Sequence, residues 1–191
     1  MISNMKKKDN EKYEKILNAA IEIIKEDGAA TLSTTKVAKR VQISQSNIYI
    51  YFKNKDDLLK QIYQSEISDY QLRFNDILEN GHSTLEKITE YIRALYDISI
   101  ENPDSMDVIE QIKQIPDSPI DMNDVVGFES NPIVDLIKKG IAENILRDVN
   151  PNIYLTMIFN TIRMNASNTK NKQNFSSFDT LLDLFLHGIL K

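Results

Sequence analysis

The chain has 191 residues, a formal net charge of -5, an apolar share of 41% and no cysteine. The lack of cysteine excludes disulfides, thiolate metal sites and a cysteine nucleophile. No run approaches the roughly 20 apolar residues that a membrane-spanning helix requires, and no apolar stretch follows the basic start, so neither a membrane span nor a signal peptide is expected. We therefore expect a soluble, cytoplasmic protein with enough apolar residues for a core.

The charge is divided unevenly along the chain. Residues 1–60 hold twelve Lys/Arg and eight Asp/Glu, a balance of +4, whereas residues 61–191 have a balance of -9. This asymmetry is what a basic domain that meets phosphates, attached to an acidic body, would give. Solvated charge scattered over the surface is the alternative.

The first element in chain order is an amphipathic helix. Apolar residues recur at three- and four-residue intervals, which predicts a helix over residues 10–27 that stops at Gly28. The Lys6-Lys7-Lys8 arm before it either lies along a nucleic-acid backbone or is a solubilising tail.

Two short helices joined by a tight turn are predicted next, in residues 34–55. Val37, Ala38, Val41 and Ile48 are apolar at helical spacing, and Ile43 fills the turn. The side chains left to face outward are mostly polar and uncharged: Thr35, Lys36, Gln45, Ser46, Asn47, Tyr49 and Tyr51. Residues 31–55 contain five basic residues and no acid. This pattern predicts a helix-turn-helix whose second helix enters the major groove of DNA.

Capping residues predict where these helices begin. We expect Thr34 to cap the second helix and Ser44 the third. Asn54 should cap a long fourth helix that reaches about residue 80, with Asp56 and Asp57 in its first turn.

The remainder of the chain is predicted to be helical. The expected helices are 83–101, 104–115, 130–143, 151–168 and 175–190, the fourth of them capped by Asn150 ahead of Pro151. Residues 116–132 are rich in proline and predict a loop, with a short helical turn around 121–127. The predicted fold class is therefore all-α with about nine helices. We expect a helix-turn-helix domain in residues 1–54 and a regulatory and dimerisation domain in residues 55–191.

The last two predicted helices, residues 151–168 and 175–190, are apolar on more than one face. A terminal helix needs one apolar stripe to pack on its own core, and a second stripe indicates a partner. A second copy of the chain, forming a four-helix interface about a two-fold axis, is the simplest such partner. A deeper core within one subunit is the alternative.

The segment Ile43-Ser44-Gln45-Ser46-Asn47-Ile48-Tyr49-Ile50-Tyr51-Phe52-Lys53-Asn54-Lys55-Asp56-Asp57-Leu58-Leu59 resembles the signature of the tetracycline-repressor (TetR)/AcrR family of bacterial transcription regulators. The resemblance covers about the first third of the chain. It departs from the family at Gln42, where family members usually carry glycine, so either Gln42 adopts a positive φ or the turn differs.

The resemblance implies how the helix-turn-helix would contact DNA. Family members place the two tyrosines and the residue matching Lys55 on the backbone, and residues like Gln45 and Ser46 near base edges. The amide of Gln45 suits a bidentate contact with adenine, and hydroxyls at a helix N-terminus suit phosphate. Phe52 is expected in the core. The candidate DNA-binding residues are Thr34, Thr35, Lys36, Ser44, Gln45, Ser46, Asn47, Tyr49, Tyr51 and Lys55.

The resemblance also implies a small-molecule pocket formed by the helices of residues 83–143. Its candidate lining residues, each of which could equally be core or surface, are Tyr91, Tyr96, Met106, Phe128, Phe159 and Arg163. Arg163 suits either an anionic ligand or a structural salt bridge.

Catalysis has little support in the sequence. His82 and His187 stand alone, and we find no phosphate-binding glycine loop, nucleophile elbow or metal-ligand spacing, so no metal or cofactor is expected. We expect a homodimeric repressor that binds an inverted-repeat operator in double-stranded DNA and is released by an unidentified small molecule. The alternative is a helical dimeric adaptor or ligand-binding protein without sequence-specific DNA binding.

Overall fold

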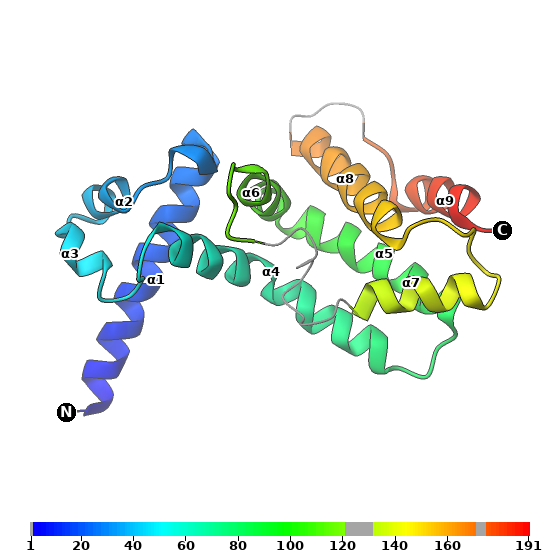
Figure 1. Cartoon of the computed structure of the whole chain (residues 1–191), viewed down its shortest axis with the longest axis horizontal. Coiled ribbons are helices and arrows are strands. Elements are labelled where there is room, and N and C mark those ends of the chain that lie inside the picture. Colours follow the sequence, from blue (N-terminus) through cyan, green and yellow to red (C-terminus); the bar gives the residue numbers. More distant parts are fainter. Residues whose placement is uncertain (1, 121–131, 171–174) are drawn as a thin grey trace. The chain divides into compact units, whose positions relative to one another are not determined.

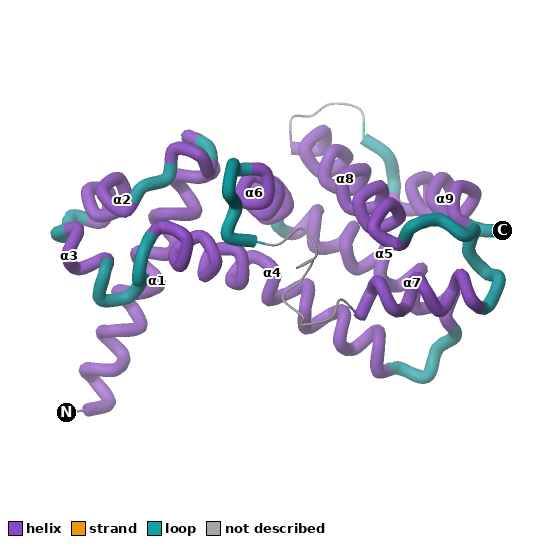
Figure 2. The backbone as a smooth tube through the Cα atoms, in the orientation of Figure 1, coloured by secondary structure: helices purple, strands orange, loops and turns teal. Residues whose placement is uncertain are grey.

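The computed structural model describes residues 2–120, 132–170 and 175–191. This part of the chain forms nine α-helices and one short 3-10 helix, and its only extended pairing is an isolated bridge between Leu146 and Leu190 (Figures 1 and 2). The predicted all-α class is therefore confirmed. The elements are α1 (Ile2–Asp27), η1 (Ala29–Thr31), α2 (Thr34–Val41), α3 (Gln45–Ile48), α4 (Lys55–Glu79), α5 (Thr84–Glu101), α6 (Pro103–Gln114), α7 (Pro132–Ala142), α8 (Pro151–Lys170) and α9 (Phe178–Ile189).

The helices form two compact units. The first unit comprises residues 1–66 with 107–122, and the second comprises residues 67–106 with 123–191. Both α4 and α6 contribute to each unit. The predicted domain boundary after residue 54 coincides with the start of α4, and the division into a DNA-binding and a regulatory domain stays a prediction.

The first unit is built on α1, which packs against α2, while α2 packs against α3. Tyr13 of α1 stacks on the buried ring of Phe52 at 5.1 Å between centroids, and its phenol donates to Gln61 Oε1 at 3.0 Å. Phe52 is therefore core, as predicted. The first half of α4 buries Leu58, Leu59 and Ile62.

Helix α1 begins at Ile2, so the predicted start at residue 10 is wrong. The apolar periodicity that guided the prediction marks only the part of the helix that packs on a core. The preceding residues contain neither glycine nor proline and no stop signal, and lysine is a good helix former, so the helix continues.

The predicted caps are partly corrected. The N-cap of α2 is Ser33, whose side chain accepts from the backbone N–H of Lys36 at 3.2 Å, and Thr34 is already the first helical residue. Ser44 occupies the N-cap position of α3 but its hydroxyl bonds to neighbouring side chains instead of a backbone N–H. Asn54 caps α4 as predicted, accepting from the N–H of Asp57 at 2.8 Å.

The second unit is centred on α5, which packs against α7, α8 and α9. A capping box between Ser83 and Glu86 starts α5. Gly140 of α7 is buried, and a Cβ there would lie 3.0 Å from Leu146 and 3.3 Å from Ile88, so only glycine lets these groups approach so closely.

The ends of the later helices differ by a few residues from prediction. Helix α8 extends to Lys170 and α9 begins at Phe178 instead of 175. The reason is Asn165 of α8, whose side-chain amide donates to the carbonyl of Ser176 and accepts from its N–H. This pair of bonds holds the backbone before α9 in a non-helical conformation until Ser177 caps the helix. The predicted turn around 121–127 lies outside the described residues.

Candidate nucleic-acid interface

The turn between α2 and α3 is made by Gln42, which has φ 57° and ψ 45°. In this left-handed conformation its N–H reaches the carbonyls of Ala38 and Lys39, and the N–H of Ile43 also reaches Ala38. The backbone therefore reverses as a glycine-containing turn would. Of the two options left open by the sequence, a positive φ at Gln42 is the correct one.

The outer surface of α2 and α3 is polar, as predicted. Thr35, Lys36, Ser44, Gln45, Ser46 and Tyr49 are exposed, whereas Asn47, Tyr51 and Lys55 are half-buried. Val37, Ala38, Val41 and Ile48 are buried and hold the two helices together. Helix α3 is short, but the N–H of Phe52 donates to the carbonyl of Ile48 at 3.0 Å, a bond across four residues as in an α-helix.

Thr34 differs from the other candidates because only 6% of it is exposed. The side-chain amide of Gln45 donates to the Thr34 hydroxyl at 2.9 Å, and the phenol of Tyr49 lies 3.4 Å from both groups. Thr34 is thus placed to orient Gln45 and Tyr49 rather than to present its own hydroxyl. A bidentate contact between Gln45 and adenine would use an amide N–H and the carbonyl oxygen, so part of this cluster must open on binding.

Acidic side chains of α1 reach the same surface. Asp27 accepts from Lys36 Nζ at 3.1 Å, and Asp9 accepts from the Tyr51 phenol at 2.7 Å. The hydrogen bond to Asp9 raises the pKa of Tyr51 above its usual value. Glu26 pairs with Arg40, which lowers the pKa of Glu26. The stretch that is free of acids in the sequence is therefore not free of them in space.

These partners are exposed, and exposed pairs contribute little to stability. Lys36 and Arg40 can therefore exchange a carboxylate for a DNA phosphate at small cost. Asn47 accepts from Lys12 Nζ at 3.3 Å, and Lys55 Nζ lies 3.5 Å from the carbonyl of Ala30. Predicted residues of α2 and α3 thus lie next to each other, as Thr34 and Gln45 show, and side chains of α1 reach the same surface.

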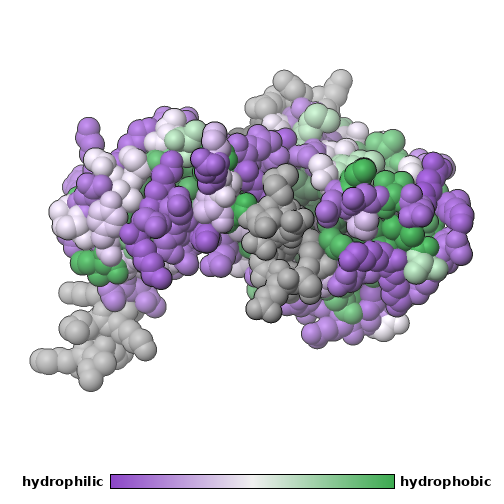
Figure 3. Space-filling model, viewed as in Figure 1, coloured by the Kyte–Doolittle hydropathy of each residue, from purple (hydrophilic) through white to green (hydrophobic). Residues whose placement is uncertain are grey.

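One exposed residue of this surface was not among the candidates. Ile50 is 71% exposed. Among the described residues, the next most exposed large apolar side chain is Leu72, at 67%. Figure 3 shows a small green area where Figure 1 places the end of α3, in white and purple surroundings. The sequence could have indicated that Ile50 is exposed. It lies between Ile48 and Phe52, which are four residues apart and both in the core, and it follows the exposed Tyr49.

A second surface of interest lies on α8 and α9. Each helix buries one stripe against its own unit, through Ile158 and Ile162 on α8 and Phe185 and Ile189 on α9. Each also exposes large apolar side chains: Ile153, Met157 and Met164 on α8, and Leu184 on α9. Figure 3 shows green surface gathered over these two helices. We call these four residues the α8–α9 apolar face.

The predicted pocket residues have different surroundings, and the pocket stays a prediction. Tyr91 is buried against Phe74 of α4, and burial raises the pKa of its phenol. Tyr96, on the same helix, packs edge-on against Phe178 of α9. Met106 is fully buried, Phe159 is half-buried, and Phe128 lies outside the described residues.

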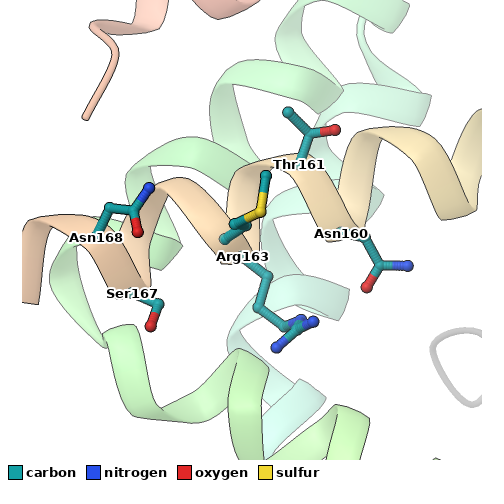
Figure 4. A pocket seen from close by; sticks show the side chains of 6 residues that line it. Asn160, Thr161, Arg163, Ser167 and Asn168 are labelled. Carbon is teal, nitrogen blue, oxygen red and sulfur yellow. The ribbon is translucent and has the colours of Figure 1, made fainter. Parts of the chain in front are cut away.

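Arg163 lies on α8, in a shallow hollow lined by Asn160, Thr161, Arg163, Met164, Ser167 and Asn168. Figure 4 shows that these side chains all come from the one helix, so the hollow is a groove along the outside of α8. It does not join Arg163 to Tyr91, Tyr96 or Met106.

Other kinds of site find no support in the described residues. No three His, Cys, Asp or Glu side chains there are grouped as a metal site would require. Nor does any helix of the described ranges combine the length and the apolar character that a bilayer span needs.

A helix-turn-helix with an exposed polar second helix and a cationic flank defines the class of DNA-binding regulators. Residues 16–62 match the family model of bacterial regulatory proteins of the tetR family. Residues 16–62 therefore carry the DNA-binding region of the TetR family, and the chain is a DNA-binding transcriptional regulator.

Three relatives show how far the likeness extends. The fatty acid metabolism regulator protein of Bacillus subtilis is 22% identical over 96% of this chain and 98% of its own. A solved structure of a transcription regulator from Lactobacillus plantarum is 28% identical, with a TM-score of 0.81 over 94% of this chain and 98% of its own. The transcriptional regulator FadR from Bacillus subtilis, solved in complex with stearoyl-CoA, has 23% identity and a TM-score of 0.70 over 93% and 99% of the two chains. The likeness thus covers both compact units, and these relatives are regulators, not enzymes.

Proposed function

We propose that this regulator is a cytoplasmic, homodimeric repressor that binds an inverted-repeat operator and is released by a long-chain acyl-CoA. The observation that carries the DNA-binding mode is that Gln45 and Tyr49, at the start and the C-cap of α3, are both exposed, with the Gln45 amide 3.4 Å from the Tyr49 phenol. In this mode α3 enters the major groove, Gln45 and Ser46 meet base edges, and Tyr49, Tyr51 and Lys55 meet the backbone. Lys36 and Thr35 at the start of α2 reach a phosphate of the DNA backbone.

The α8–α9 apolar face supports the proposed homodimer. Its exposed residues on α8 follow a spacing of four and seven residues, so they form one stripe, and Arg163 and Lys170 are the only charged residues of that helix. Two copies of the face would form a four-helix interface about a two-fold axis. The two copies of α3, which we call the reading helices, would be related by that axis. They require DNA half-sites about one turn of the double helix apart or somewhat more, roughly 34–36 Å between centres.

The proposed ligand rests on the relatives together with the interior of the second unit. A relative over the full length is a fatty acid metabolism regulator of Bacillus subtilis, and the structure of FadR from the same organism holds stearoyl-CoA. Side chains buried in the second unit include Phe74, Tyr91 and Met106, and such apolar surroundings suit an acyl chain. To release DNA, the ligand must bind more tightly to the state that does not fit the operator, because equal affinity for both states would shift nothing.

Selecting bound sequences from random DNA and titrating them by gel shift tests the DNA-binding mode. Replacing Lys55 by alanine should weaken binding to all sequences and make the log–log salt dependence shallower by about 0.9 per subunit, the value of one phosphate contact. Replacing Gln45 by alanine should instead change the preferred bases. An unchanged affinity and slope for Lys55→Ala would remove that residue from the interface.

The same assay separates the proposal from a helical adaptor or ligand-binding protein. Such a protein would retain no DNA fragment in a site-selective, salt-sensitive way. With the selected operator in hand, stearoyl-CoA should release the DNA, while coenzyme A and stearate serve as controls for the two halves of the ligand. Release by neither stearoyl-CoA nor shorter acyl-CoA molecules would reject the ligand class and leave the DNA-binding mode intact.

A further inference from the structure

Ile50 is a large aliphatic side chain that the fold leaves 71% exposed on the surface proposed to face DNA. Ile48 and Phe52, two residues before and after it, are fully buried and anchor this segment to the core. Both the N–H of Tyr51 and that of Phe52 bond to the carbonyl of Ile48 at 3.0 Å, which continues the helical turn through this segment. The apolar side chain of Ile50 is therefore exposed to solvent.

Ile50 lies in the turn directly after α3, which ends at Ile48 and has Tyr49 as its C-cap, and so follows the residues proposed to read bases. Residues four apart lie on the same side of a helix. Gln45 and Tyr49 form one such pair, as the 3.4 Å contact between amide and phenol indicates. Ser46 and Ile50 form the adjacent pair, and both are exposed. The outer face of α3 and of the turn after it thus carries the polar side chains of Gln45, Ser46 and Tyr49 and ends in an aliphatic group.

The major groove offers one apolar group on its base edges, the C5-methyl group of thymine. Every other edge group that distinguishes base pairs there is a hydrogen-bond donor or acceptor, which isoleucine cannot pair. We infer that Ile50 is a specificity-determining residue that packs on the C5-methyl group of one thymine in each half-site. This inference rests on the proposed DNA-binding mode.

A lipid surface or a protein partner would account less well for the same residue. The aliphatic group is single on this surface and is surrounded by Ser46, Tyr49 and Lys53, which are exposed and polar or amphipathic. The exposed apolar residues of the α8–α9 apolar face, by contrast, come as a group of four. A single methyl-bearing contact among hydrogen-bonding groups is suited to one base.

The test uses the full-length protein and its selected operator. Each thymine is replaced in turn by deoxyuridine, which removes only the C5-methyl group and keeps base pairing. For the unaltered protein we expect one symmetry-related pair of thymines at which the exchange weakens binding about fourfold per half-site, the effect of one buried methyl group. For Ile50→Ala that exchange should have no effect, because the contact is already gone.

Leu72→Ala is the matched control, since Leu72 is exposed to a similar degree but lies on α4 in the second unit. Circular dichroism of both variants verifies folding. The inference would be overturned if, at every thymine, the deoxyuridine exchange weakened binding of Ile50→Ala as much as binding of the unaltered protein. It would also be overturned if Ile50→Ala bound the operator as tightly as the unaltered protein. Failure of the unaltered protein to select any sequence would instead reject the proposed DNA-binding mode and the inference with it.

Discussion

At the scale of single residues, Gln42 has an uncommon conformation for its type. Its φ of 57° is left-handed, where a Cβ approaches the following carbonyl, and this costs roughly 1–2 kcal/mol for residues other than glycine. The turn nevertheless forms, because Val37, Ala38 and Ile48 bury their side chains across it. The local strain is therefore offset by packing between the helices that the turn connects.

Replacing Gln42 by glycine should stabilise the protein. The relief of strain exceeds the extra backbone freedom that glycine gives the unfolded chain, so we expect a net gain on the order of 0.5–1 kcal/mol in the free energy of unfolding. Urea denaturation measures it. The matched control is Gln64→Gly in the exposed interior of α4, where the same exchange should cost about 1 kcal/mol. A loss at both positions would show that the turn is not strained.

At the scale of elements, α6 is tied to the turn after α1 within the first unit. The side-chain oxygen of Gln111 accepts from the N–H of Ala29 at 3.1 Å. Ala29 is almost fully buried at the start of η1, and Gly28 before it has a φ of 89° that favours glycine. The position of η1, and so of the chain entering α2, depends on a residue more than eighty positions away.

Replacing Gln111 by leucine should destabilise the first unit. The leucine keeps much of the volume but leaves the buried N–H of Ala29 without its acceptor, which costs about 1–3 kcal/mol. The Gln111→Glu variant retains an acceptor oxygen and should lose clearly less. Denaturant titration followed by circular dichroism compares the two. Equal stability of the leucine variant and the original would mean that this bond contributes nothing.

At the scale of the whole molecule, the α8–α9 apolar face sets the proposed assembly. Met164 and Leu184 are each 60% exposed, a large apolar area for one subunit to leave in water. In the proposed dimer these side chains are buried, and a carboxylate among them would be desolvated without a partner. The two-fold spacing of the reading helices follows from this interface, so dimerisation and operator binding should be lost together.

The Met164→Glu and Leu184→Glu variants should therefore be monomeric and should bind the operator weakly. Light scattering coupled to size-exclusion chromatography measures the mass. Leu72→Glu introduces the same charge at a residue that is 67% exposed outside this face, and it should remain dimeric. A dimer that persists in Met164→Glu and Leu184→Glu would place the interface elsewhere.

Much of the fold could be predicted from sequence because helices are encoded by near neighbours. The predicted cap Asn54 marked the start of α4, and the predicted start of the next helix at residue 83 lies within one residue of α5. The errors occur where local signals are weak or are overridden. The start of α1 was missed because residues 2–9 have no sustained run of apolar residues at helical spacing, and the start of α9 because Asn165 holds the preceding backbone from a distance.

By itself, the sequence determined the all-α class, the helix-turn-helix and the TetR resemblance, since each depends on residue types at short spacing. Only the tertiary structure decided how the reading surface is arranged. It buries Thr34 against Gln45, brings Asp9 to Tyr51 across 42 positions, and leaves Ile50 in water. These features depend on contacts between residues far apart in the chain, and no local pattern encodes which distant side chain will arrive.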